Sequence, residues 1–235
     1  MSKKLYKYET HLHTLPVSKC AKAGVYESLE YYKKAGYDGV FITNHFIDGN
    51  ITMSRDEPYE KLINFYFSDY EEGLVIGKKL GIKVFSGVEL SYGGTDFLIY
   101  GLDKRWYLDH PEINGMDKKK ELALMDSFGA LIIQAHPFRE ANYIDHIRLY
   151  PRSVHGVETV NACRTDLENE MAAIYAEKYG LLPFAGTDNH SAGRRVSYAG
   201  MCGDTPLKDE ADFVKRIKEG KMRLFTENKP ENLIK

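Results

Sequence analysis

The sequence predicts an α/β protein built from repeated helix–strand units. Along the 235 residues, an amphipathic segment, a glycine and a short apolar run recur in that order. Apolar residues follow a period of 3.6 in the amphipathic segments and form short buried runs after each glycine. The glycines stand where a helix needs a left-handed C-cap. Repeated units of this kind imply parallel strands joined by right-handed crossovers.

Each expected helix has apolar residues on one face and ends at a glycine. These residues are Val25, Leu29 and Tyr32 before Gly36; Leu62, Ile63, Tyr66 and Tyr70, between Pro58 and Gly81; Leu122 and Met125 before Gly129; Leu167, Met171, Ile174 and Tyr175 before Gly180; and Phe213 and Ile217 before Gly220. The expected strands are 7–11, 39–43, 82–88, 130–135, 156–160 and 181–185, with weaker candidates at 97–101, 197–201 and 222–225. A barrel and an open doubly wound sheet both fit this pattern.

Composition indicates a soluble globular protein that we expect to form one domain over residues 1–235. Hydrophobic residues make up 43% and charged residues 28%, and the net charge is −2. This charge provides no argument for stable binding to nucleic acid or to an anionic membrane.

Cysteine usage and the N-terminus favour a cytoplasmic location. Cys20, Cys163 and Cys202 are odd in number and widely spaced, which is a poor disulfide framework. The basic segment Met1–Tyr8 has no apolar stretch behind it, so neither a signal peptide nor a membrane span is expected.

Five predicted strands run directly into residue types that bind metal ions. In parallel α/β folds, active sites are built at this carboxyl end of the strands. Histidine and carboxylate ligands without thiolate suit Mn, Zn or Fe. The five strand ends read His11-Leu12-His13, Thr43-Asn44-His45, Gly87-Val88-Glu89, His136-Pro137 and Gly186-Thr187-Asp188-Asn189-His190.

The spacing of these residues suits more than one ion. His11 and His13 point to the same side of an extended segment, and so do Asp188 and His190, because side-chain direction repeats every two residues. Glu89 can bridge two ions with its two carboxylate oxygens. Paired ions about 3.5–4 Å apart stabilise the attacking and leaving oxygens of phosphoryl transfer.

Each motif has a structural alternative when taken alone. A single His-x-His is a weak signal, and an Asp-x-His in a loop is often a turn. Five of the eight histidines follow predicted strands, however, which makes coincidence a poor explanation. We expect surface or structural roles for His110, His146 and His155. For Cys20 we favour a thiol that lies beside the site over a ligand.

Several further residues are candidates near these loops. Arginine binds phosphate through a planar fork of N–H donors. Four arginines that follow the strand ends could therefore hold a substrate phosphate: Arg139, Arg164, Arg194 and Arg195. Glu158, at the end of its own strand, could either bind a metal ion or orient a ligand.

Taken in order, these motifs resemble those of the PHP (polymerase and histidinol phosphatase) superfamily. The resemblance covers about residues 8 to 200 and implies a distorted, TIM-like (β/α)7 barrel with two or three divalent transition metal ions. Members hydrolyse phosphoesters. By this resemblance, His11, His13, Glu89 and Asp188 bind one metal, Glu89 and His136 a second, and His45 and His190 a third.

The sequence departs from the family pattern at three places. The family commonly has a further His or Asp soon after His-x-His-Thr, where this chain has Cys20, and a His on the strand after the glutamate, where it has Asp96. Either residue could substitute as a ligand. Asn44 replaces an Asp before the second-motif histidine, which we expect to affect the surroundings of the site.

We therefore expect a stand-alone metal-dependent phosphatase or phosphoesterase in which a metal-bound hydroxide attacks a small phosphomonoester or nucleotide. Its catalytic residues would be His11, Glu89 and Asp188. A metal-dependent amidohydrolase is one alternative, although such barrels usually need a metal-bridging lysine on a middle strand. A non-catalytic metal-binding barrel is the other.

Overall fold

The computed structural model describes residues 4–193 and 197–228, which form ten strands, six α-helices and one 3-10 helix. The strands are β1 (Tyr6–Leu12), β2 (Gly39–Ile42), β3 (Lys83–Ser86), β4 (Val88–Tyr92), β5 (Thr95–Tyr100), β6 (Leu131–Ala135), β7 (Gly156–Asn161), β8 (Leu182–Gly186), β9 (Ser197–Gly203) and β10 (Arg223–Asn228). The helices are α1 (Val25–Lys34), α2 (Tyr59–Leu80), α3 (Lys104–Asp109), η1 (Pro111–Ile113), α4 (Lys118–Ser127), α5 (Asp166–Tyr179) and α6 (Glu210–Lys218).

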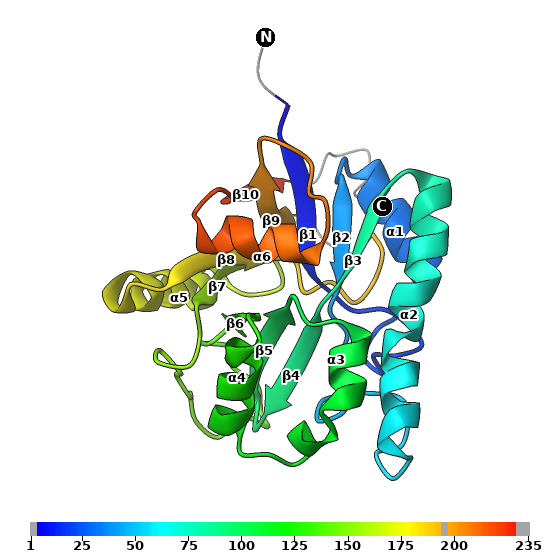
Figure 1. Cartoon of the computed structure of the whole chain (residues 1–235). Coiled ribbons are helices and arrows are strands. Elements are labelled where there is room, and N and C mark those ends of the chain that lie inside the picture. The colour runs from blue at the N-terminus through cyan, green and yellow to red at the C-terminus, as the bar shows by residue number, and fades with distance from the viewer. Residues whose placement is uncertain (1–3, 194–196, 229–235) are drawn as a thin grey trace.

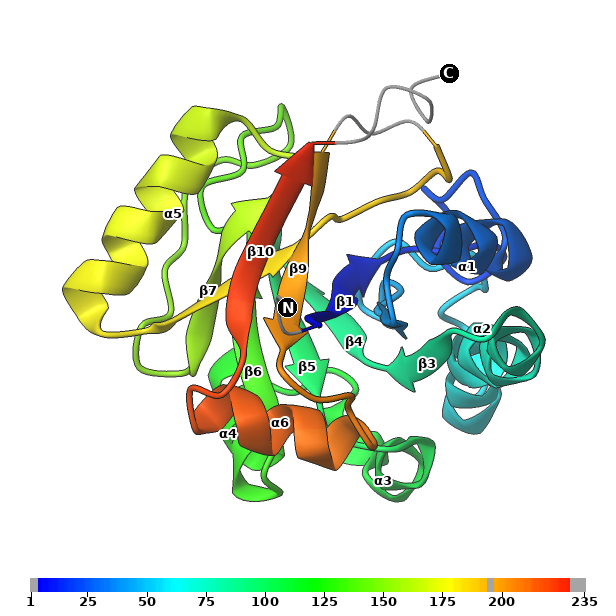
Figure 2. The ribbon, with the colours of Figure 1, turned by 90° about the horizontal axis from the view of Figure 1, so that it is seen from above.

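The strands form two five-stranded sheets (Figures 1 and 2). Their orders are β10-β9-β1-β2-β3 and β4-β5-β6-β7-β8. Neighbours in β1-β2-β3 and in β6-β7-β8 are parallel, as the repeated units predict. The pairs β1/β9, β9/β10, β4/β5 and β5/β6 are antiparallel, so the expectation of an all-parallel arrangement is wrong for them.

The predicted α/β class is confirmed, whereas a closed (β/α)7 barrel is not found among the described residues. The apolar run 82–88 is divided at Gly87 into β3 and β4, which belong to different sheets. A Cβ at Gly87 would lie 2.8 Å from Thr43 Cγ2 and 3.0 Å from Tyr100 Cδ1, so glycine lets the chain pass between these side chains. On the other side, the Thr10 hydroxyl of β1 donates to the carbonyl of Ala185 in β8 at 2.5 Å.

An aromatic cluster fills the space between the two sheets. Phe213 of α6 is fully buried and packs on Phe41 of β2, with ring centroids 4.3 Å apart. It also lies 5.3 Å from Tyr100 of β5 and 6.2 Å from Phe184 of β8. One side chain of α6 therefore contacts strands of both sheets, and burial of these rings holds the sheets together.

We expect Phe213→Ala to lower the free energy of unfolding by about 3–5 kcal/mol, because it leaves a cavity among these rings. Phe128→Ala, at a phenylalanine that is 53% exposed, is the matched control. It should cost about 1 kcal/mol or less. Urea unfolding followed by circular dichroism measures both. Equal destabilisation by the two substitutions would contradict a role of Phe213 in joining the sheets.

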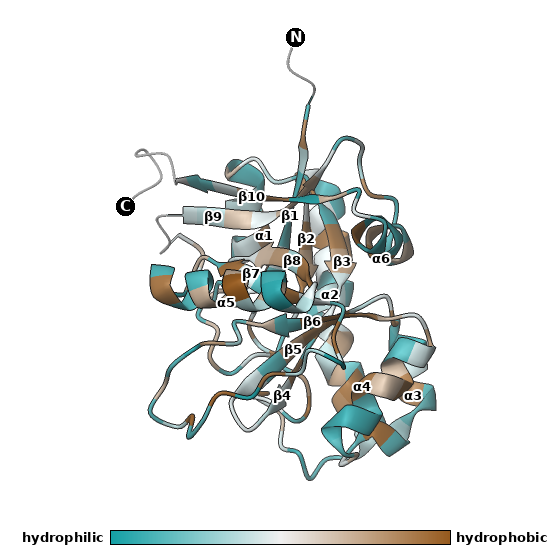
Figure 3. Cartoon of the chain, turned by 90° about the vertical axis from the view of Figure 1, so that its left-hand side faces the viewer, coloured by the Kyte–Doolittle hydropathy of each residue, from teal (hydrophilic) through white to brown (hydrophobic). Residues whose placement is uncertain are grey.

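The expected helices are all present, but in one of them only Tyr175 of the four predicted core residues is buried. All five predicted glycine caps have positive φ values, as their role requires. In α5, however, Leu167, Met171 and Ile174 are exposed, and the buried residues are Ala172, Tyr175 and Ala176. The side of α5 that packs on the sheet is thus lined mainly by alanine. Figure 3 shows apolar colour on the outward surface of this helix.

No described helix is both long enough and apolar enough to span a bilayer.

Candidate metal centre

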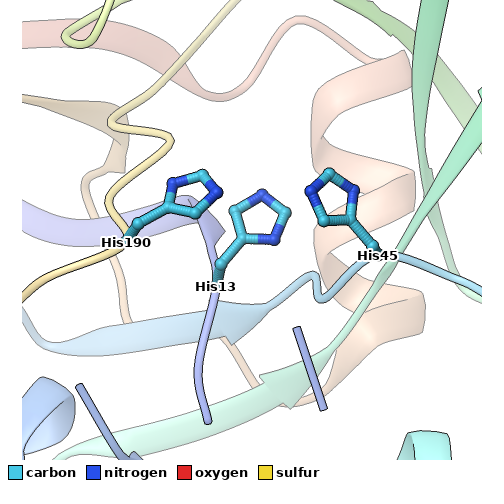
Figure 4. A group of neighbouring side chains, drawn as sticks. All are labelled: His13, His45 and His190. Carbon is cyan, nitrogen blue, oxygen red and sulfur yellow. The ribbon is translucent and has the colours of Figure 1, made fainter. Parts of the chain in front are cut away.

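The structure brings all seven predicted metal ligands to one place. Six of them lie at or just beyond the carboxyl ends of β1, β2, β6 and β8, whereas Glu89 is the second residue of β4. Their ligand atoms form four groups within which all atoms lie inside 4.8 Å of one another. Figure 4 shows one group, in which the rings of His45 and His190 lie on either side of His13. The groups are His13, His45 and His190; His11, His13 and Glu89; His11, His136 and Asp188; and Glu89, Asp96 and His136.

Strand ends position these side chains by ordinary backbone pairing. His13 lies one residue beyond β1, and its N–H donates to the carbonyl of Asn189 at 3.1 Å, which joins the first and last motifs. His45 pairs with Glu89 through an isolated parallel bridge. The predicted meeting of strand ends thus occurs even though the strands belong to two sheets.

Two of the residues occupy a strained backbone conformation. His136 has a φ of 24° and Asp188 a φ of 54°, in a backbone region that residues other than glycine rarely adopt. Backbone strain of this kind is concentrated at functional sites, where the surrounding structure maintains it. Next to them, Gly186 makes room for the site: a Cβ there would lie 2.6 Å from the Cβ of His11 and 2.9 Å from Glu158 Oε1.

Glu89 lies at the centre of the cluster. Its Oε1 is 3.1 Å from His11 Nε2 and 3.5 Å from His136 Nε2. Its Oε2 is 2.6 Å from His45 Nδ1 and 3.4 Å from His13 Nε2. The two oxygens therefore face different pairs of histidines, as the predicted bridging role requires.

The cluster satisfies the chemical requirements of a cation site. Four buried atoms of the cluster lack a hydrogen-bond partner of proper geometry, although buried polar atoms normally have one. Nitrogen and carboxylate oxygen ligands without a bound thiolate suit Mn, Zn or Fe. The four atoms are His45 Nδ1, Glu89 Oε2, Asp96 Oδ2 and His136 Nε2.

The charges of these groups are strongly coupled. Burial opposes ionisation of Glu89, yet the neighbouring histidines hold its pKa well below the usual range. Burial and two adjacent histidines, His190 and His45, lower the pKa of His13 well below 6.5. Glu89 is therefore ionised and His13 neutral at pH 7, and these are the forms that bind metal ions.

Glu158 contacts two predicted ligands and belongs to none of the four groups, which favours an orienting role over a ligand role. Its Oε1 is 2.9 Å from His11 Nδ1, and its Oε2 accepts from the His136 N–H at 3.0 Å and from Asn161 Nδ2 at 2.8 Å. With the His11 proton on Nδ1, where Glu158 accepts it, the Nε2 lone pair of that ring would be directed into the cluster.

Glu9 is a supporting residue that the sequence analysis missed. It is fully buried, and its Oε1 accepts from the backbone N–H groups of Thr10, His11 and Thr187 at 2.9, 2.7 and 3.0 Å. It thereby joins the first and last motifs. The period of two along a strand could have indicated it, since Glu9, His11 and His13 share one side of β1 and its extension.

The departures from the family pattern have separate structural outcomes. Asp96 joins the group of Glu89 and His136, so the structure supports it as an additional ligand. Cys20 lies on the cavity wall beside His45 and His190, and it belongs to none of the four groups. Burial raises the pKa of its thiol, but hydrogen bonds to these two histidines outweigh that effect and lower it to about 6.

Asn44 belongs to a hydrogen-bond network behind the site. Its amide nitrogen donates to Asp69 at 2.8 Å, and its oxygen accepts from the Ser18 hydroxyl at 2.8 Å. The Ser18 hydroxyl lies 3.1 Å from His13 Nδ1. Asn44 therefore affects the centre through Ser18, as expected for a residue in its surroundings.

The four arginines differ in their placement. Arg139 lies on the cavity wall and pairs with Asp96 at 3.1 Å. Arg164 is partly buried, has no hydrogen-bond partner at Nε, and does not line that cavity. Arg194 and Arg195 lie outside the described residues. Of the predicted phosphate-binding residues in the described chain, Arg139 is thus the one at the cavity.

The other histidines take the surface or structural roles expected of them. His110 stacks on Trp106 with ring centroids 4.4 Å apart, and His155 Nδ1 accepts from the N–H of Ile132 at 3.1 Å. His146 is exposed and lies 2.9 Å from Asp145. None of the three belongs to the metal-binding groups.

Comparison with known proteins supports the resemblance. Residues 166–222 match the PHP-associated family model. No curated protein matches the chain. A two-domain protein from Bacteroides vulgatus that contains a predicted PHP-like metal-dependent phosphoesterase shares the fold with a TM-score of 0.70 and 14% identity, over 94% of this chain. This chain spans only 65% of that protein.

Two further solved structures share the fold. PsfC from Pseudomonas syringae has a TM-score of 0.61 and 15% identity, over 98% of this chain and 94% of its own. An amidohydrolase from Chromobacterium violaceum has a TM-score of 0.54 and 14% identity, over 92% and 97%. The family match over residues 166–222, from α5 through α6, and the fold shared with a protein that contains a predicted PHP-like phosphoesterase confirm the predicted resemblance to the PHP superfamily.

Proposed function

We propose that the chain is a metal-dependent hydrolase of small phosphoesters. The observation that carries this proposal is the convergence of buried nitrogen and carboxylate oxygen atoms around Glu89, under an open cavity. His11, His13, Glu89 and Asp188 would hold one ion, Glu89, Asp96 and His136 a second, and His45 with His190 a third. Divalent ions bound there would acidify a water molecule and neutralise phosphate oxygens.

The residues of the chain position these elements of the reaction. Glu158 maintains the His11 tautomer whose Nε2 faces the cluster. Arg139 is oriented by Asp96 and is placed to donate to a phosphate oxygen. Burial of the cluster strengthens these interactions because little water competes with them.

No nucleophilic side chain is needed for this reaction. Cys163 donates through its sulfur to the backbone carbonyl of Asp188 at 2.8 Å, which is a structural role. Cys20 lies on the cavity wall, but the proposed reaction uses water as the nucleophile. We therefore expect no phosphorylated cysteine during turnover.

Amide hydrolysis is the second candidate, because the fold is shared with the amidohydrolase from Chromobacterium violaceum. Amide hydrolysis in such barrels usually requires a lysine that bridges two ions. Among the described residues, Lys118 is the only buried lysine, and it pairs with Asp48 and Glu121, which belong to none of the four groups, whereas Glu89 is at the centre. This composition favours phosphoester chemistry.

One experiment tests metal content and reaction together. Protein purified without chelator is measured by elemental analysis and then offered p-nitrophenyl phosphate, mononucleotides, other phosphomonoesters and a panel of amides. We expect at least two transition metal ions per chain, and phosphoester turnover that is lost with chelator and restored by Mn, Zn or Fe. Turnover of amides alone would favour the amidohydrolase. Bound metal without any turnover would favour a binding protein.

A further inference from the structure

Arg55 lies on the wall of the cavity above the candidate metal centre, in the segment between β2 and α2. Its Nη2 donates to the backbone carbonyls of Asp48 at 2.9 Å and Gly49 at 2.6 Å. Gly49 packs against His45, since a Cβ at this glycine would lie 3.0 Å from the Cβ of His45. These contacts hold the guanidinium group next to the His45 side of the centre.

The charge of Arg55 is not neutralised by the described part of the chain. Arg55 forms no ion pair with a carboxylate among residues 4–193 and 197–228, and its contacts are to neutral carbonyl groups. The carboxylate of Asp48 does not compensate it, because Asp48 Oδ2 is bound by Lys118 at 2.6 Å. Arg139, the other arginine of the cavity wall, is paired with Asp96. Arg55 is thus a positioned cation with its charge free for a ligand.

The two arginines are associated with different parts of the centre. Arg139 contacts Asp96, which belongs to the group of Glu89 and His136. Arg55 is held beside His45, which belongs to the group that also contains His13 and His190. A phosphoester bound next to Arg139 would therefore leave Arg55 to contact another part of the substrate. The cavity of about 560 Å³ has room for a small metabolite.

We propose that the substrate carries a second anionic group, apart from the phosphoester that is cleaved, and that Arg55 binds it. This inference rests on the proposed function for the position of the phosphoester. A planar guanidinium binds carboxylate and phosphate alike through two parallel N–H donors. The shared chemistry is therefore a carboxylate or phosphate joined to the phosphoester by a short carbon chain.

Phosphonates test the proposal by binding alone, because they are not hydrolysed. Three series with two to six carbons are titrated calorimetrically into protein in manganese-containing buffer. One series carries a terminal carboxylate, one a second phosphonate and one a neutral hydroxyl. At the chain length that spans the cavity, we expect the carboxylate or the second phosphonate to bind about tenfold more tightly than the hydroxyl compound. The two charged series distinguish the two sources of the anion.

Variants of Arg55 assign this preference to the side chain. Arg55→Gln retains an N–H donor but has no charge, and it should abolish the preference while the hydroxyl compounds bind as before. Arg55→Lys should retain part of it. Arg105→Ala is the matched control, since Arg105 is 77% exposed on α3 and its ion pair in the described part of the chain is with Asp109. It should change nothing.

The outcomes separate this proposal from the proposed function. Equal binding of charged and neutral series at every length, or a preference that survives in Arg55→Gln, would overturn the second-anion site. Failure of all compounds to bind would overturn it as well. Turnover of p-nitrophenyl phosphate reports independently on the reaction. Tighter binding of the compounds with a second anionic group, without any phosphoester turnover, would thus reject the proposed hydrolase function and support the second-anion site at Arg55.

Discussion

Glu89→Gln is expected to abolish most hydrolytic activity and to remove metal from more than one position. Each oxygen of Glu89 faces a different pair of histidines, with His11 Nε2 at 3.1 Å from Oε1 and His45 Nδ1 at 2.6 Å from Oε2. The substitution keeps the shape but replaces one oxygen with an NH2 donor, which cannot bind a cation. It also removes the negative charge that balances the histidines. We expect metal affinity to fall by more than about 100-fold, since loss of a residue that merely orients a ligand costs 10–100-fold.

Elemental analysis after gel filtration, together with the hydrolysis rate, measures this effect. The matched control is Glu60→Gln, at an exposed glutamate of α2, which should retain full metal content and rate. Circular dichroism separates loss of the site from loss of the fold. A Glu89→Gln protein with unchanged metal content and activity would show that Glu89 does not bind metal.

The second large effect is expected from Glu158→Gln, although Glu158 is not a proposed ligand. One oxygen faces His11 Nδ1, and the other accepts from the His136 N–H and from Asn161 Nδ2. A glutamine has only one oxygen for these two positions. If its NH2 group faces His11, that ring must accept at Nδ1 and carry its proton on Nε2, where it can no longer bind a metal ion. If the NH2 group instead faces the His136 N–H and Asn161 Nδ2, it meets two donors and cannot accept from either.

Either orientation should weaken metal binding by about 10–100-fold. Competition with a chelator of known affinity measures this, and 15N NMR of the histidine side chains reports the His11 tautomer. Glu170→Gln, at an exposed position of α5, is the control. Wild-type metal affinity and an unchanged tautomer in Glu158→Gln would contradict the orienting role. A purely structural role would lower stability without changing the tautomer.

Much of the fold could be predicted from local pattern. Apolar runs and glycine caps identify the strands and the five longer helices, because they depend on residues close together in the chain. Glu89 of β4 pairs with Leu98 of β5, and no local sequence pattern specifies that these two strands run antiparallel. The antiparallel pairs and the division at Gly87 therefore emerge only in the tertiary structure. The exposed Leu167, Met171 and Ile174 show the same limit, because helical period does not specify which face meets the sheet.

For the site, the sequence by itself determined which residues converge. The motifs follow strand ends, and adjacent strand ends meet, so the motifs alone assign His11, His45 and His136 to one centre. Only the tertiary structure decided which residues support that centre. Glu158 contacts His11 at 2.9 Å across 147 residues of the chain, and Arg55 reaches the cavity wall because its loop packs beside the centre. A strand-end glutamate or a loop arginine has no local signature of such a position, because the position is set by the packing of the two sheets.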